Sequence, residues 1–476
     1  MLFRSVAAAA LDADNTVANI AFTGSTNTFS AASTLANDGT LTFGDATGDS
    51  FTFNGGLTTS DVGGTVTLNT SISTSNDALV FGAITLGNNI TLDTNATNTT
   101  GDLTIGAVTG GSNTLTLTTE NNIANADITA SGNISGVTTL TLTSVGGTAT
   151  FAGDVDVTTL AIGNTVANVA INGNGSTITN DIDFANDGTL QLGDASGDTL
   201  TFNGGLDTSD VGGTVTLNGT IDTSNDAITF DAVTLGSATT IDTNATDTTG
   251  DIAIGVVTGG SNALTLSMGN NVANTDISAT GNISGVTTLT ISNAGGTATL
   301  SGDVDVTTLT IGNTVANVAI NGDGSTVTND IDFANDGTLQ LGDATGDTLT
   351  FNGGLDTSDV GGTVTLNGTI DTSNDAVTFG AVTLGSATTI DTNASNTTGD
   401  IAIGAVTGGS NNLTLTTGDN VANSDITASG AISGLGNLTL ADVGGTATFS
   451  ANVAAAALSA DSTVDRKSTR LNSSHW

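Results

Sequence analysis

Apolar residues alternate with threonine in short runs throughout the chain, as in residues 214–217 (TVTL), 264–266 (LTL) and 309–311 (LTI). Because successive side chains of a strand point to opposite faces, this two-residue period predicts strands with one buried face. Pairs such as Gly-Gly, Asn-Asp and Asn-Gly stand between the runs, and these residues adopt the backbone angles of tight turns. A helical period is absent, so the pattern predicts an all-β chain.

The strands belong to a long internal repeat. The string NDGTL begins at Asn37, Asn186 and Asn335, so equivalent residues recur every 149 positions. The string VAAAAL begins at Val6 and again at Val453, three periods later. Independent domains are usually joined by linkers of distinct composition. No such change separates one period from the next, which favours one continuous architecture.

We therefore predict a division of the chain by period, with an arbitrary phase. Its parts are residues 1–5, a non-native head; 6–36, a partial repeat; 37–185, repeat 1; 186–334, repeat 2; 335–464, an incomplete repeat 3; and 465–476, a non-native tail. The head and the tail are set apart because their composition differs from that of the repeats.

Strands of about four to six residues that arrive every ten positions or so favour an elongated, right-handed parallel β-solenoid, or β-helix. Each turn would take roughly twenty-odd residues and bury its apolar side against the turns above and below it. Phenylalanines at strand positions are expected in this core: Phe53, Phe81, Phe202, Phe230, Phe351 and Phe379. The alternative is a series of tandem β-sandwich domains of 149 residues each. Missing linkers and the lack of Trp or Tyr anchors disfavour it.

Both ends of the chain resemble translated sequencing adapter. The tail from Asp465 to His475 reads DRKSTRLNSSH, and the head reads MLFRS, each as expected from adapter sequence. The tail also holds three of the four basic residues, the only histidine and the only tryptophan: Arg466, Lys467, Arg470, His475 and Trp476. We therefore expect residues 6–464 to be an internal fragment of a longer repeat protein, whose export signal and anchor lie elsewhere.

Composition excludes several classes of protein. The chain has 46 acidic and 4 basic residues, a net charge of −42, and no cysteine, proline or tyrosine. Without cysteine there is no disulfide framework, thiol nucleophile or Cys-ligated metal. So negative a chain is repelled by nucleic acid and by anionic lipid. No apolar stretch approaches the roughly 18 residues of a membrane-spanning helix. We therefore expect no nucleic-acid binding, because of the charge, and no membrane insertion, because a spanning segment is missing.

The residues that most catalytic sites need are missing from the repeats. Residues 6–464 contain no His, Lys, Arg or Trp, so Ser-His-Asp chemistry lacks its base and oxyanions lack a cationic partner. We therefore predict that the chain is not an enzyme. A carbohydrate-active enzyme on a β-helix is a remote alternative, because glycoside hydrolysis needs only two carboxylates.

The motif Gly-Asp-x-x-Gly-Asp occurs once in each period and places two acids close together. Oxygen-rich, acidic turns bind calcium, so its aspartates are weak calcium candidates: Asp45, Asp49, Asp194, Asp198, Asp343 and Asp347. Turn formation by these aspartates is the favoured interpretation. Elsewhere acids are exchanged between periods, as in Asn174 against Asp323 and Asp231 against Gly380. We therefore expect no required cofactor, and calcium or other divalent cations only as a diffuse layer that stabilises the fold.

The Thr/Asn/Asp/Gly repeats, as in GGTATLSGDVDVTTLTIGNTVANVAING at residues 295–322, resemble the β-strand repeats of large bacterial surface proteins. These include autotransporter passengers and filamentous-haemagglutinin-like adhesins. The likeness covers residues 6–464 and is one of composition and rhythm. It implies a secreted, non-enzymatic structural or adhesive stalk at the bacterial cell surface, whose partners would be a host or neighbouring-cell surface or matrix. The alternative is a calcium-dependent surface-assembly or ion-binding repeat.

Overall fold

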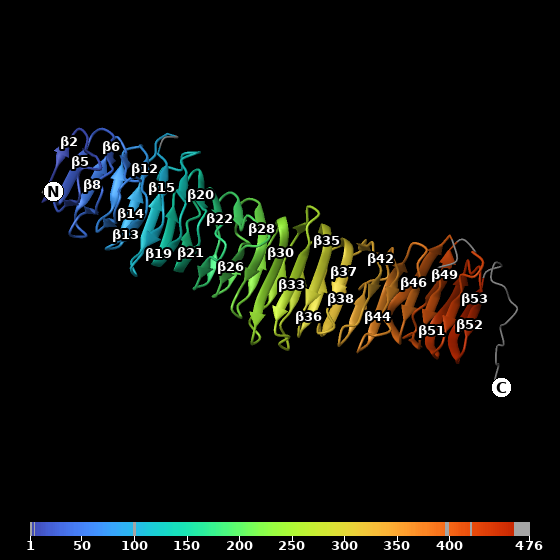
Figure 1. Cartoon of the computed structure of the whole chain (residues 1–476). Coiled ribbons are helices and arrows are strands. Elements are labelled where there is room, and N and C mark those ends of the chain that lie inside the picture. Colours follow the sequence, from blue (N-terminus) through green and yellow to red (C-terminus); the bar gives the residue numbers. More distant parts are fainter. Residues whose placement is uncertain (1, 4, 99–100, 396–398, 419–420, 461–476) are drawn as a thin grey trace, which may run out of the picture. The chain divides into compact units, whose positions relative to one another are not determined.

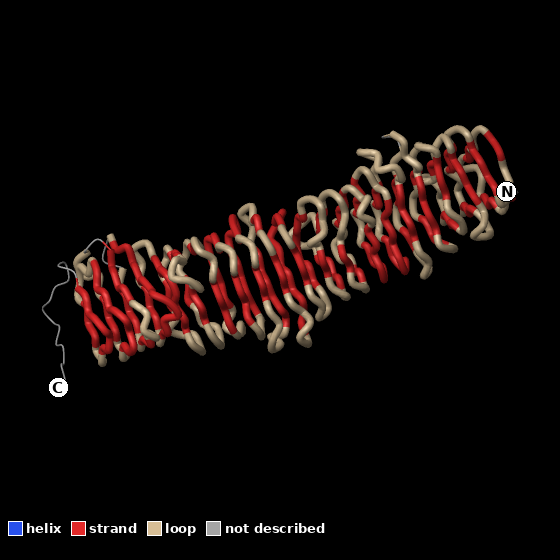
Figure 2. The backbone as a smooth tube through the Cα atoms, turned by 180° about the vertical axis from the view of Figure 1, so that it is seen from behind, coloured by secondary structure: helices blue, strands red, loops and turns tan. Residues whose placement is uncertain are grey.

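The computed structural model describes residues 2–3, 5–98, 101–395, 399–418 and 421–460. These residues form strands joined by turns and bends, and none of them lies in a helix (Figures 1 and 2). Accordingly, no helix suited to crossing a membrane occurs in this described part. The adapter-like tail, residues 465–476, lies outside the described residues, as do Met1 and Arg4 of the head.

Three strands make one turn of the chain. Strands β4 (Ile20–Phe22), β5 (Thr26–Phe29) and β6 (Ser33–Leu35) are followed by β7 (Leu41–Phe43), β8 (Ser50–Phe53) and β9 (Leu57–Thr58). Each strand of the first group pairs in parallel with its counterpart three strands later. The parallel β-solenoid predicted from the sequence is thereby confirmed. The tandem β-sandwich alternative is wrong, because sandwich sheets are built from antiparallel strands.

The chain divides into two compact units, residues 1–242 and 243–476. The division falls within β30 (Val233–Ala245) and coincides with none of the predicted repeat boundaries, so the repeats describe the sequence rather than separate bodies. Each unit is a stack of three-sided turns. Long strands in each unit continue from one side of a turn to the next. Examples are β19 (Ile134–Thr143), β21 (Val155–Ile162) and β28 (Val215–Asp222) in the first unit, and β35 (Ile283–Ser292), β37 (Val304–Ile311), β44 (Val364–Asp371), β46 (Val382–Ala394) and β51 (Ile432–Ala441) in the second.

In the first unit, one sequence period is not a whole number of turns. Leu41 pairs in register with Val66, which leads on to Val108 along one side. Leu190, its equivalent one period later, belongs instead to the column of Leu57. Leu57 follows Leu41 by two sides, and six turns separate Leu57 from Leu190, so a period takes about six and two-thirds turns. Equivalent residues of successive periods therefore lie on different sides of the solenoid.

The second unit shows the same offset. Ser267 pairs with Ser292 at the end of β35. Its equivalent one period later, Thr416, is connected through Asp371 and the strands between to Ser284, near the start of β35. Because β35 covers two sides, the two equivalents lie on different sides here as well.

The core is a set of columns of apolar side chains, one stacked on the next from turn to turn. The phenylalanines predicted in the core are all buried, with at most 3% of their surface exposed. The densest cluster is near the start of the first unit, where the ring of Phe43 stacks on Phe22 with centroids 5.5 Å apart. Phe51 and Phe53 meet the same ring edge-on, at 5.4 and 6.0 Å. Such contacts within a turn and between neighbouring turns replace a globular core.

Asparagine and aspartate in the bends connect one turn to the next. The side-chain oxygen of Asn168 accepts the backbone N–H of Thr189 at 2.9 Å, 21 residues along the chain. Asp127 accepts the N–H of Thr148 in the same manner at 2.7 Å. We call these contacts inter-turn bonds. They extend the hydrogen bonding between turns into the bends, where the strand ladder is interrupted.

Candidate functional site

The predicted calcium candidates lie in one kind of turn. In the first period, Oδ2 of Asp49 accepts the backbone N–H of Asp45 at 2.9 Å and of Ala46 at 3.1 Å. Asp45 itself is exposed at the bend. The Asp49 carboxylate therefore closes the turn by capping two amides of its own loop, which is how aspartate stabilises turns.

The other two copies of the motif have the same bonds. Asp198 caps Asp194 and Ala195 at 2.7 and 2.8 Å, and Asp347 caps its turn equally. Asp198 and Asp347 are buried, whereas Asp194 and Asp343 are exposed. Within the described residues, no three His, Cys, Asp or Glu side chains gather in a way that could hold a metal ion. Calcium binding at these turns stays a prediction.

A second acidic feature is the stacking of carboxylates in register. Asp371 on β44 pairs directly with Asp391 on β46, and Asp332 pairs with Asp356 one side away. Burial, followed by the charge of Asp391, raises the pKa of Asp371 to about 6. Burial and then the charge of Asp356 likewise raise the pKa of Asp332 above its ordinary value. Like charges in adjacent parallel strands destabilise the ladder when both are ionised.

These raised pKa values predict that the protein is more stable in mild acid than at neutral pH. A carboxylate with a higher pKa in the folded state binds its proton more tightly there, so the free energy of unfolding increases as the pH falls through about 6 toward 4. For Asp371 we expect a gain on the order of 1 kcal/mol after solvent screening. Urea unfolding between pH 7.5 and 4.5 measures it.

Asp371→Asn provides the matched test, because it removes the titrating group and keeps its shape. We expect this variant to be more stable than the parent chain at pH 7.5 and to have a flatter pH profile. Asp38→Asn removes one charge at an exposed bend and should leave the slope unchanged. Equal slopes in both variants would assign the pH dependence to net charge instead of to the stacked pair.

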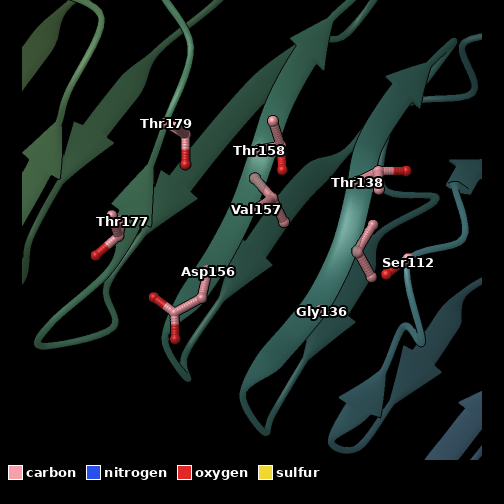
Figure 3. Close-up of a pocket in the computed structure, with 9 residues that line it drawn as sticks. Ser112, Gly136, Thr138, Asp156, Val157, Thr158, Thr177 and Thr179 are labelled. Atoms are coloured by element: carbon pink, nitrogen blue, oxygen red, sulfur yellow. The ribbon is translucent and has the colours of Figure 1, made fainter.

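A shallow surface groove of about 410 Å³ lies in the first unit. Figure 3 shows the residues that line it. The groove lies where β19 shifts its register against β21 between Ser135 and Val137. Gly136, at the shift, has a φ of 67°, a left-handed conformation that favours glycine. The buried side chains of Val137 and Val157 form the floor. The rim consists of hydroxyl groups and one carboxylate: Ser112, Thr138, Thr158, Thr177, Thr179 and Asp156.

The rim of this groove can donate and accept hydrogen bonds but carries no cation. Burial, and then the neighbouring carboxylate of Asp154, raise the pKa of Asp156 above its ordinary value. A second groove of about 420 Å³ in the second unit has the same lining one period later, with Gly285 at the shift and Asp305 on the rim. In the third period alanines stand at the equivalent rim positions, Ala454 and Ala456. Such grooves suit polar, uncharged ligands.

The grooves were not predicted from the sequence. Their signal is the recurring string ISGV, in which a glycine interrupts an otherwise regular strand. Isolated glycine in a strand marks a bulge or a close backbone approach.

Comparison with protein families, with curated proteins and with solved structures finds no match to this chain.

Proposed function

We propose that the chain is a non-enzymatic structural or adhesive stalk of a large secreted bacterial surface protein. The observation that carries the proposal is the way each unit is extended. Turns are laid on one another by paired parallel strands and by inter-turn bonds, so a further turn adds one layer without altering those already present. An architecture of this kind serves well as a spacer. Location at the bacterial surface rests on the resemblance of the repeats.

The proposed structural role is tested by pulling on the chain. The whole chain is held by tags at its two ends and stretched in optical tweezers. Since each turn contacts only its neighbours, we expect many small extensions of one or a few turns at a sustained force. Extension at forces no higher than those needed to stretch an unstructured linker would overturn the structural role.

The adhesive role is tested with fluorescent beads coated with the whole chain. Binding to epithelial cells and to immobilised fibronectin and collagen is compared with that of albumin-coated beads, in calcium and in EGTA. A double variant in each unit, Asp156→Ala with Thr158→Ala and Asp305→Ala with Thr307→Ala, introduces the alanines that the third period already carries. Adhesion that weakens several-fold in this variant supports contact through the grooves.

Two outcomes would redirect the proposal. Binding that requires calcium, with saturable heat of calcium binding in calorimetry, would favour the cation-dependent assembly repeat. Release of reducing ends from a panel of polysaccharides incubated with the chain would overturn the non-enzymatic assignment.

A further inference from the structure

An asparagine amide at one corner of the solenoid is buried with one of its two polar atoms satisfied and the other without a partner. The side chain of Asn37 is fully buried, and its Nδ2 donates to the carbonyls of Gly39 and Thr40 at 2.9 and 3.1 Å, and to Ala18 of the turn below at 3.3 Å. Its Oδ1 is buried and accepts no hydrogen bond from the described residues. Three carbonyls around Nδ2 fix the orientation of the amide, since the flipped form would place oxygen against oxygen.

A threonine of the next turn has the same deficiency at the same corner. Thr59 is 1% exposed, and its Oγ1 is buried without a partner in the described part of the chain. It follows β9, which stacks on β6, while Asn37 follows β6. The N–H of Gly63 donates to the backbone carbonyl of Asn37 at 2.8 Å, which holds the two loops together. The two atoms therefore belong to adjacent layers of one corner.

The pair recurs in each period with the same two atoms unpaired. Asn186 and Thr208 form it in the first unit and Asn335 and Thr357 in the second. Because a period takes about six and two-thirds turns, the first two pairs lie at different corners, and their surroundings differ. Leu35 precedes the first corner where Phe184 precedes the second. The two buried atoms thus lack partners in different surroundings, so the feature depends on the asparagine–threonine pair and not on its neighbours.

A buried polar atom without a partner costs about 1–3 kcal/mol, and proteins commonly avoid that cost with an internal water. We propose that each corner binds one water molecule. The water donates one hydrogen bond to the asparagine Oδ1 and forms a second hydrogen bond with the threonine Oγ1, which can donate or accept. The pair offers a neutral amide oxygen and a hydroxyl, and the nearby carboxylates of Asp38 and Asp61 are exposed outside the corner. Such a donor set suits water better than a cation, which needs about six oxygens.

The decisive variant is Thr208→Val, which replaces the hydroxyl by a methyl group of similar size. If Oγ1 of Thr208 binds a water, removing this hydroxyl takes away one hydrogen-bond partner of the water, and the water then holds the Asn186 oxygen less well. The urea midpoint should therefore fall. The matched control is Thr223→Val. Thr223 is equally buried and recurs in each period, but its Oγ1 donates to the carbonyl of Asp226 at 2.5 Å. We expect the two variants to lose similar amounts.

A midpoint that stays level or increases in Thr208→Val while it falls in Thr223→Val would show a dry corner and overturn the proposal. A crystal structure of the parent chain gives an independent readout that does not depend on how a variant folds. Density for one water within hydrogen-bonding distance of both atoms is expected at each of the three corners. A direct bond between Asn186 and Thr208, or anomalous density at the corner after a rubidium soak, would contradict it.

Discussion

Replacing Phe43 by alanine is expected to lower the free energy of unfolding of the first turns by about 3–5 kcal/mol. The ring is fully buried and meets Phe22, Phe51 and Phe53 at 5.4–6.0 Å, so its removal leaves a cavity and breaks three ring contacts. Hydrogen exchange measured by mass spectrometry should show lost protection over strands β4 to β9. Strands of the second unit, such as β44, should keep theirs because turns contact only their neighbours.

Phe43→Leu is the control for size, since leucine fills most of the space and should cost much less. Lost protection that spreads equally over both units would contradict the nearest-neighbour description and indicate a single cooperative body. A loss below about 1 kcal/mol would mean that the neighbouring rings close the cavity.

Gly259→Ala is expected to destabilise the second unit by about 3 kcal/mol. Gly259 follows β32 (Val257–Thr258) and lies in register with Gly285, where β35 shifts its register. A Cβ at position 259 would stand 2.5 Å from the backbone carbonyl group of Gly285 and from the nitrogen of Val286. These backbone atoms cannot move aside without separating the two turns. Thermal unfolding followed by circular dichroism measures the effect.

Gly346→Ala is the matched control in the same unit, because a Cβ there meets nothing within 4 Å. It should change the midpoint little. If both glycine variants lose stability equally, the contact between turns would not be the cause, because the reduced flexibility of the unfolded chain by itself favours alanine over glycine.

The strands and the composition of the core could be predicted because both are local properties. Alternation places Leu264 and Leu266 on the same face of a strand whatever lies beside them, and both are buried. The offset between the period and the turns could not be predicted. Turn length is irregular: Val66 and Ile84, one turn apart, are separated by 18 residues, but Val108 and Ile134 by 26. A sequence period therefore does not reveal how often the chain has gone around.

The candidate site likewise has features that could be predicted from the sequence and features that could not. That Asp49 forms a turn follows from its neighbours in the sequence, since it caps residues three and four positions before it. The stacking of Asp371 on Asp391 depends on register between turns, as does the bond from Thr148 to Asp127. Both partners lie about a turn away, at a distance along the chain that the sequence does not mark. Contacts between residues close in the sequence could therefore be predicted, whereas contacts between turns could not.

Because a period is not a whole number of turns, a change in the number of repeats in the gene would change which way later residues face. Tandem copies in DNA are readily gained or lost by unequal recombination, one unit at a time. Here each such event would move every later residue to another side of the solenoid, by about a third of a revolution. Three events would return it to its original side. Changes in copy number would therefore redirect the surface that a given segment displays as well as alter the reach of the protein.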